Sequence, residues 1–389
     1  MKSVKSNVLL LFITLLFITS CSENTPENLE SSHTLNFVTD YKNFIPPVVP
    51  SITFSDIFSE LQLVPLEPKK ECMLTRIEKF KVDGDKIFIY NEGANLGVFV
   101  FDINGKYLNK IGDIGTAKDE YIYIEDMTID TENKRVLILT LDNVKMYEYD
   151  GKYIATIPLE MNGRFFRIES NEYGYWFASP HTGLEYLLHQ YDKDFTPINH
   201  YFKISTEMTH SVPTFNNPIQ CDGNKVCYYD EFDSKFGVVE LGDSISVNTY
   251  RFHTGKEKTF KKHQKNSADF LYDEILGFCF AKGKSIGGIV LDRIGGYNFV
   301  ADYSANTLKL VPNVDGFSNL MDVYSDGYYY AVESPEYLDQ IFVTDFRTSK
   351  ETKELFKKQI DSFKYPISPE SNYILVRTKL NDKTIDEYE

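Results

Sequence analysis

Short runs of alternating hydrophobic and polar residues, separated by turns that contain glycine, extend along most of the chain and predict β-strands. The clearest pattern occurs twice, at residues 101–108 and again 46 residues later at residues 147–154. Each copy has an aromatic-rich strand, an Asn-Gly or Asp-Gly turn and a second strand, which is typical of a β-hairpin. A repeat of about 40–50 residues built from such hairpins predicts a β-propeller.

The spacing of the strands predicts four-stranded units along the chain. Two units are sharply alike, at residues 77–111 and 126–159, and weaker copies follow at about 165–204, 218–252, 276–312 and from 319 onward. We therefore expect an all-β fold, a six-bladed β-propeller of four-stranded antiparallel blades. The weaker units also allow a division into five or seven blades.

The last unit contains the features from which we expect the ring to close. Its strands are expected at residues 320–324, 328–333, 340–344 and 373–380, and a Thr-x-x-Glu capping box at residue 348 predicts a helix over residues 349–363, inserted into this blade. Near the start, Ser55 or Asp56 can cap a helical turn at residues 57–60. The following strand at residues 61–66 contains Pro65, which predicts an edge strand. We expect it to pair with residues 373–380 and join the ends of the ring.

The N-terminus has the layout of an export signal. Lys2 and Lys5 precede an apolar run at residues 8–19, and Ile-Thr-Ser-Cys closes the run at Cys21. The run is too short to span a bilayer, and its ending has the form of a bacterial lipobox. We expect residues 1–20 to be a lipoprotein signal peptide, Cys21 to be the lipid attachment site, residues 21–50 to be a flexible stalk and residues 51–389 to be the propeller.

The net negative charge of the chain argues against nucleic acid and anionic lipid as partners. The formal net charge of the whole chain is −16, and removal of Lys2 and Lys5 with the signal peptide leaves −18. An acidic surface repels phosphate groups, so we expect no nucleic-acid partner and membrane contact through the lipid alone.

Cys221 and Cys227 flank an Asp-Gly-Asn turn. A disulfide across this turn is geometrically feasible in an oxidising compartment, and two buried free thiols are the alternative. The cysteines lack the paired CxxC spacing of a zinc site.

Aromatic residues suggest where a ligand would bind. Tyr173, Tyr175 and Trp176 lie close together in the sequence and are candidates for a platform that stacks on a glycan or a peptide. The alternative is that these aromatic side chains pack one blade against the next.

We predict no metal site or cofactor, with calcium as the open alternative. His181, His189 and Glu185 surround one loop, but the histidines do not have the spacing that directs two imidazoles to one ion. Acidic clusters occur at residues 119–120, 125–126 and 230–233, and none of them has the form of a dedicated calcium loop.

Four segments resemble a known family: Leu-Val-Pro-Leu-Glu at residues 63–67, the Phe-Asp-x-Asn-Gly-Lys hairpin, residues 112–121 and residues 369–375. They are similar to the six-bladed β-propeller lipoproteins of Bacteroidetes, which are NHL-like propellers. The family commonly has Gly-x-Gly-Pro-Gly-Glu-Tyr after the first blade, and this chain departs from it with Ala-Lys-Asp at residues 117–119. The resemblance implies the propeller fold and a lipid-anchored place in the cell envelope, at the outer membrane; it implies no specific activity.

From these observations we expect a binding or scaffolding propeller whose ligand, a glycan, a peptide or an envelope protein, sits at one face or at the channel mouth. The alternative is an enzyme at the same place, such as a metal-assisted lyase or hydrolase. The chain lacks a G-x-S-x-G elbow and an H-E-x-x-H helix.

Overall fold

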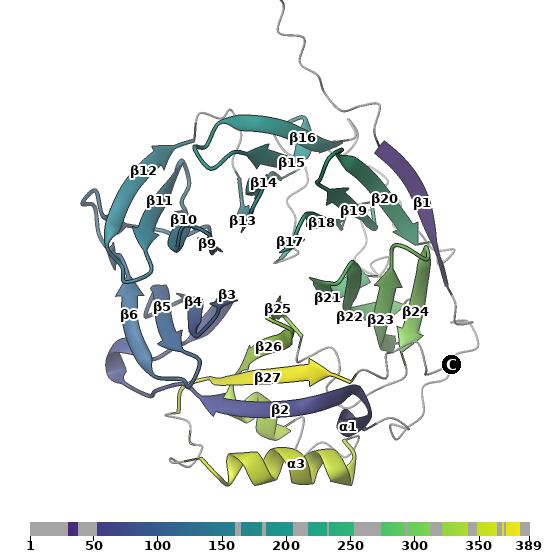
Figure 1. Cartoon of the computed structure of the whole chain (residues 1–389). Coiled ribbons are helices and arrows are strands. Elements are labelled where there is room, and N and C mark those ends of the chain that lie inside the picture. Colours follow the sequence, from purple (N-terminus) through teal and green to yellow (C-terminus); the bar gives the residue numbers. More distant parts are fainter. Residues whose placement is uncertain are drawn as a thin grey trace, which may run out of the picture.

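The structure is a computed structural model, and it describes residues 30–37, 53–159, 165–180, 184–204, 217–231, 233–252, 274–291, 295–311, 321–340, 348–363, 368 and 371–381. Most of these residues belong to antiparallel β-sheets that stand around a common axis (Figure 1). This is the arrangement of a β-propeller. Within the described part of the chain, no helix is long and apolar enough to cross a membrane.

Three of the sheets are meanders of four consecutive strands. The first contains β3 (Arg76–Asp83), β4 (Lys86–Glu92), β5 (Gly97–Asp102) and β6 (Tyr107–Ile111). The second contains β9 (Asp126–Asp130), β10 (Arg135–Leu139), β11 (Asn143–Glu148) and β12 (Tyr153–Pro158). The third contains β13 (Arg167–Asn171), β14 (Gly174–Ala178), β15 (Tyr186–Tyr191) and β16 (Pro197–Lys203). The strand predictions for these three units are confirmed.

A nine-stranded sheet holds two further meanders on either side of one N-terminal strand. One meander contains β17 (Ile219–Asp222), β18 (Lys225–Asp230), β19 (Lys235–Glu240) and β20 (Ser246–Phe252). The other contains β21 (Glu274–Ala281), β22 (Lys284–Leu291), β23 (Gly295–Asp302) and β24 (Thr307–Val311). Between them lies β1 (Glu30–Phe37), which pairs in parallel with β20 and then with β24.

Strand β1 corrects the expected extent of the stalk. Residues 30–37 fall within the stretch 21–50 that composition indicates to be flexible, yet they form a strand, and Leu35 is only 1% exposed. The Nε2 of His33 donates to the Asn248 side-chain carbonyl at 3.0 Å, and the His33 ring stacks on Tyr250. The pairing is with strands more than 200 residues away, so no local pattern indicates it.

The last sheet joins the two ends of the chain, as predicted. Its order is β2 (Phe58–Pro65), β27 (Ile374–Leu380), β26 (Tyr328–Glu333) and β25 (Val323–Ser325), with β2 at the outer edge. The position expected for the strand at residues 340–344, third in this sheet, is wrong, because β26 pairs directly with β27. Most of that stretch lies outside the described residues.

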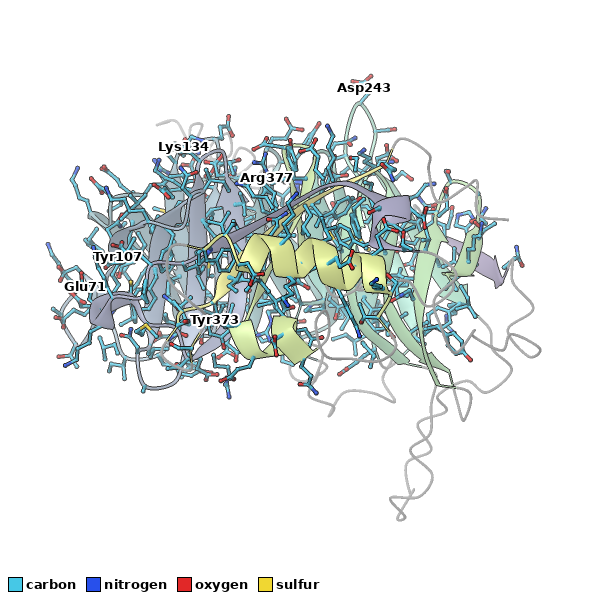
Figure 2. The ribbon with its side chains drawn as sticks, turned by 90° about the horizontal axis from the view of Figure 1, so that it is seen from below. Glu71, Tyr107, Lys134, Asp243, Tyr373 and Arg377 are labelled. Atoms are coloured by element: carbon cyan, nitrogen blue, oxygen red, sulfur yellow. The ribbon has the colours of Figure 1, made fainter. Side chains whose placement is uncertain are left out.

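Helix α3 (Lys350–Ile360) lies outside β2, confirming the predicted helix (Figures 1 and 2). Its N-cap is Ser349, whose Oγ accepts from the Thr352 amide, rather than Thr348. Gln359 accepts from the Leu63 amide at 2.9 Å and donates to the Leu61 carbonyl at 2.6 Å, so the helix satisfies part of the open edge of β2.

The other helical segments are short. The predicted helical turn near residue 57 starts three residues earlier, as α1 (Phe54–Ile57), because the Thr53 amide and hydroxyl both donate to the Asp56 carboxylate. Helix α2 (Pro335–Leu338) follows β26, and a 3₁₀ turn, η1 (Lys70–Cys72), follows β2.

The segment between β6 and β9 carries the departure from the family motif. It forms a small parallel pair, β7 (Asp113–Ile114) with β8 (Glu120–Tyr121). The Glu120 carboxylate accepts from the Ala117 amide at 2.8 Å, and the Glu120 amide donates to the Ala117 carbonyl. Glu120 therefore closes this turn.

Candidate functional site

The innermost strand of each sheet lines the axis of the ring (Figure 1). These strands are β3, β9, β13, β17, β21 and β25, and each contacts the next around the ring, with β25 contacting β3. Because the inner strands run side by side in the same direction, their first residues meet at one end of the axis.

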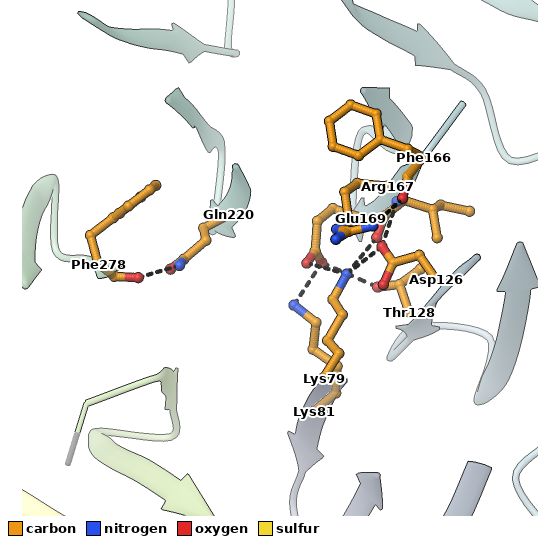
Figure 3. Close-up of polar contacts among 10 residues, drawn as sticks. Lys79, Lys81, Asp126, Thr128, Phe166, Arg167, Glu169, Gln220 and Phe278 are labelled. Carbon is orange, nitrogen blue, oxygen red and sulfur yellow. Dashed lines mark hydrogen bonds and ion pairs between the residues drawn. The ribbon is translucent and has the colours of Figure 1, made fainter. Parts of the chain in front are cut away.

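A buried ion-pair network joins three of these strands on one side of the axis (Figure 3). The Lys79 ammonium lies 2.8 Å from the Asp126 carboxylate and 3.0 Å from the Glu169 carboxylate, and it donates to the Ile168 carbonyl at 2.9 Å. Lys81 lies 2.7 Å from Glu169, and Thr128 donates to Glu169 at 3.2 Å. We name these five residues, Lys79, Lys81, Asp126, Thr128 and Glu169, the axial network.

Burial and charge act in opposite directions on the axial network. Burial alone favours the neutral forms, but the carboxylates of Asp126 and Glu169 outweigh it and raise the pKa of Lys79. In the same way, Lys79 and Lys81 outweigh the effect of burial and hold the pKa of Glu169 below its ordinary value. These charges therefore neutralise one another, and the network fastens β3, β9 and β13 together.

The opposite side of the axis is joined by an amide (Figure 3). Gln220 on β17 donates to the Phe278 carbonyl and accepts from the Phe280 amide at 2.7 Å, both on β21.

Between these two sides lies a cavity of about 410 Å³, which we name the axial cavity. Its polar lining comes from Arg76, Glu78, Lys79, Asn217, Asp322, Glu333 and Tyr373. Its apolar lining comes from Ile77, Phe80, Leu276, Phe278, Val323 and Val332, with Gly277 between them. The contributing residues lie on β3, β21 and the last sheet, or next to them in the chain, except Asn217, which precedes β17.

The charges of the axial cavity are unequally compensated. Arg76 is paired with Glu78 and Glu92, and Lys79 belongs to the axial network. By contrast, the carboxyl groups of Asp322 and Glu333 have no hydrogen-bond or ion-pair partner among the residues that the structure describes.

Both uncompensated carboxyls have raised pKa values. Asp322 is exposed at the surface, but the surrounding wall of the ring limits the hydration of its carboxyl and raises its pKa to about 7. Burial raises the pKa of Glu333 to about 8, and the nearby Asp322 adds to the shift. At neutral pH, Asp322 and Glu333 are therefore partly protonated, whereas ordinary carboxyls are fully ionised.

The predicted aromatic platform is wrong. Tyr175 and Trp176 are fully buried, and Tyr173 alone is exposed, at 36%. Tyr175 donates to Asp130 at 2.8 Å, and Trp176 donates to Asn171 at 2.9 Å and packs between neighbouring sheets. These rings therefore fulfil the alternative role, packing one sheet against the next.

The disulfide between Cys221 and Cys227 does not form, and both thiols are free. In the hairpin, Cys221 is opposite Val226 and Cys227 is opposite Gln220. The one-residue offset directs the two thiols to opposite faces of the sheet. Burial raises the pKa of each thiol, which keeps it protonated.

The candidate metal ligands are not brought together. His181 lies outside the described residues, His189 is hydrogen-bonded to His200 at 2.9 Å, and Glu185 pairs with Lys203. Burial lowers the pKa of His189 to about 4, with the neighbouring His200 as the second cause. In the part of the chain that the structure describes, no three His, Cys, Asp or Glu side chains converge.

The acidic clusters have separate structural roles. Asp126 belongs to the axial network, Glu120 closes the turn before β8, and Asp233 pairs with Lys235 and Arg251. Cys21 lies outside the described residues.

Sequence reasoning missed the axial cavity. One observation pointed toward it: Lys79 and Lys81 alternate with apolar residues in a strand otherwise expected to be buried. Asp322 and Glu333 give no such indication, because each lies at the end of a strand, where polar residues are ordinary.

Comparisons with known proteins agree with this architecture. The family model described as "Domain of unknown function (DUF4934)" matches residues 44–379. A structure from Bacteroides fragilis, provisionally named an exported protein, is similar with a TM-score of 0.63 and 18% identity, over 90% of this chain and 99% of that one. A member of the DUF4221 family from Bacteroides vulgatus is similar with a TM-score of 0.50 and 9% identity, over 83% of this chain and 97% of that one. No curated protein matches the chain significantly.

Proposed function

The chain belongs to the DUF4934 family, and from this premise we propose that it is a six-bladed propeller, lipid-anchored outside the cytoplasm, that binds a ligand at the axial cavity. Its ligand would be a glycan, a peptide or an envelope protein. This is the role of a binding or scaffolding module.

The sheet order supports the count of six. Four separate sheets have four strands, and the nine-stranded sheet divides at β1 into two further meanders of four. The inner strands of these six units make a closed series of contacts. Six NHL-like blades also agree with the resemblance to Bacteroidetes lipoproteins.

The sequence at the N-terminus supports the location. A short apolar run ending in Ile-Thr-Ser-Cys at Cys21 fits acylation of that cysteine after export. The exported name of the Bacteroides fragilis structure points the same way. We place the anchor in the outer membrane, and we leave its periplasmic or surface face to experiment.

The observation that carries the binding role is the axial cavity with its two uncompensated carboxyls. A cavity of about 410 Å³ is within the usual range for ligand sites, and Asp322 and Glu333 meet there with an apolar wall from Leu276 and Phe278. Carboxyls with raised pKa values and without an opposite charge, lying together in a cleft, are a usual sign of recognition rather than of stability.

A binding screen tests this role. The mature chain and the double variant Asp322→Asn, Glu333→Gln would be applied to glycan and peptide arrays, and the variant should lose at least tenfold in affinity for the ligands found. The matched control is Glu148→Gln, which removes an exposed carboxylate on β11. Equal binding by all three proteins would contradict a site at the axial cavity.

One observation favours the second candidate, an enzyme at the same cavity. Carboxyl groups with pKa values of about 7 and 8 can donate a proton at neutral pH, which suits a lyase or hydrolase. Turnover of an array ligand by the mature chain, lost in Glu333→Gln, would favour this candidate over simple binding.

A further inference from the structure

The axial cavity has a chemical preference that follows from its charges. Its two basic side chains are already satisfied, Arg76 by Glu78 and Glu92, and Lys79 by Asp126 and Glu169. The carboxyls of Asp322 and Glu333 have no such partner among the described residues. Among the described residues, the charge left without an opposite partner in this cavity is therefore negative, which favours a positively charged ligand.

The rest of the lining suits the stem of a long side chain. Leu276 is 63% exposed, although it lies in an inner strand, and Phe278 and Val332 add apolar wall. Long basic side chains place methylene groups along apolar surface and their charge beyond it.

Exposed apolar residues also lie at the end of the ring where the cavity opens. Ile122 (69% exposed) and Tyr123 lie within the four residues before inner strand β9, as Arg76 begins β3 at the cavity. Leu141 (60% exposed) follows β10 at the same end, where the Glu125 amide donates to the Leu139 carbonyl. Large apolar side chains gathered at one end of a ring are typical of a protein-contact surface.

The lining favours a peptide over a sugar. A sugar site usually offers an open aromatic face, but Phe80 and Phe278 are buried, and the half-buried Tyr373 donates its hydroxyl to the Thr75 carbonyl.

We propose that this end of the ring docks a peptide segment of a partner protein, whose lysine side chain enters the axial cavity and lies against Asp322 and Glu333. Apolar neighbours of that lysine contact Ile122, Tyr123 and Leu141. The inference rests on the proposed binding function and specifies the ligand of the same site.

A cation in the cavity would also be linked to protons. The carboxyls hold protons near neutrality because they lack a counter-charge, and an ammonium group beside them favours their ionised forms. Binding of lysine should therefore release protons, which a purely apolar contact would not do.

The test uses the mature full chain and calorimetry with acetyl-Gly-Leu-Lys-Leu-Gly-amide. The matched probe carries Nε-acetyl-lysine, which keeps the length and removes the charge. We expect the lysine peptide to bind at least tenfold more tightly, and its binding heat to change with the ionisation enthalpy of the buffer. Asp322→Asn, Glu333→Gln should abolish the preference, and Glu148→Gln should retain it.

Several results would overturn the inference: no detectable binding of the lysine peptide, equal binding of both peptides, or stronger binding of a glucosamine tetramer. If another array ligand still depends on Asp322 and Glu333, the proposed function stands and only the lysine preference fails. If no ligand depends on them, the proposed function fails as well. Equal melting curves at pH 5, where both carboxyls of the native chain are protonated, would establish that the double variant is folded.

Discussion

At the scale of single residues, the inside of the ring contains ionisable groups of two kinds, those paired with an opposite charge and those without one. Lys79 and Glu169 are almost inaccessible to solvent, yet each keeps its charge because an opposite charge lies within 3.0 Å. Glu333 has no such partner, and its pKa is raised to about 8. Removing one member of the first group would leave a buried charge unpaired, which typically costs about 3–5 kcal/mol. Removing the carboxyl of Glu333, which has no such partner, should not destabilise the fold.

The raised pKa values predict how stability depends on pH. In the folded chain Asp322 and Glu333 hold their protons up to pH of about 7 and about 8, whereas unfolded carboxyls lose them near pH 4. The folded state therefore binds more protons between these values, and the pair lowers the free energy of unfolding as pH rises. We expect the double variant Asp322→Asn, Glu333→Gln to melt like the wild type at pH 5 and at least about 2 °C higher at pH 8.5, roughly the effect of 1.5 kcal/mol in a chain of this size.

Thermal unfolding followed by circular dichroism across this range would measure the difference. The other charges that face the cavity, Arg76, Glu78 and Lys79, are present in both proteins, so the comparison isolates the carboxyl pair. A difference in melting temperature that does not grow with pH would show that the pair is already ionised at pH 5.

Residue identity predicted the fold better than it predicted the site. Aromatic residues at 175 and 176 carry the same alternation whether they face a ligand or a neighbouring sheet, and only the ring shows that both are enclosed. Asp322 and Glu333 are separated in the chain by the β25–β26 hairpin, so their meeting depends on strand register. Such a meeting is a property of tertiary structure that a single sequence does not display.

At the scale of elements, the repeated hairpin does more than reverse the chain. Gly105 has φ +83°, and a Cβ there would collide with the Pro65 carbonyl of β2. Gly151 has φ +92°, and a Cβ there would lie 2.7 Å from the Lys110 carbonyl of β6. Each turn thus presses against the outer strand of the preceding sheet. The two glycines are required both by turn geometry and by packing between neighbouring sheets.

Strand β1 gives a prediction at this scale. Leu35 is 1% exposed and packs with Tyr250, Phe252 and Leu308, so Leu35→Ala should weaken the docking of β1 by about 2–4 kcal/mol. The rest of the ring should keep its structure, because the sheets on both sides have their own cores. Hydrogen exchange should become faster at the amides of residues 30–37 and remain unchanged in β3–β6.

The control is Thr34→Ala, at an exposed position of the same strand. Unchanged exchange in Leu35→Ala would mean that backbone pairing with β20 and β24 holds β1 without its side chain.

Elements with local signatures were predictable, and those that depend on distant partners were not. The closure of β2 on β27 could be predicted because both strands have strong apolar patterns and a ring must join its ends. Strand β1 has the composition of a linker, and its pairing with β20 and β24 supplies the order that its sequence lacks.

At the scale of the whole molecule, β1 limits where the lipid anchor that we propose at Cys21 can lie relative to the ring. Cys21 precedes Glu30 by nine residues, and a fully extended chain spans about 3.5 Å per residue, so the anchor lies within about 30 Å of the start of β1. A stalk that ran to residue 50 would let any part of the rim approach the membrane. With β1 docked, the rim at β20 and β24 should stay near the bilayer, and the rim at β12, on the far side of the ring in Figure 1, should stay away from it.

This orientation can be measured by energy transfer to labelled lipid headgroups in vesicles that carry the acylated chain. A donor at Ser246→Cys, next to the start of β1, should transfer more efficiently than a donor at Lys152→Cys, beside β12. Inserting a flexible segment of 20 Gly and Ser residues between residues 29 and 30 should reduce that difference, because the longer tether has a root-mean-square reach of roughly 25 Å more. Equal transfer from both positions in the native chain would contradict a fixed orientation, since a ring that turns freely on its anchor brings both rims to the membrane equally often.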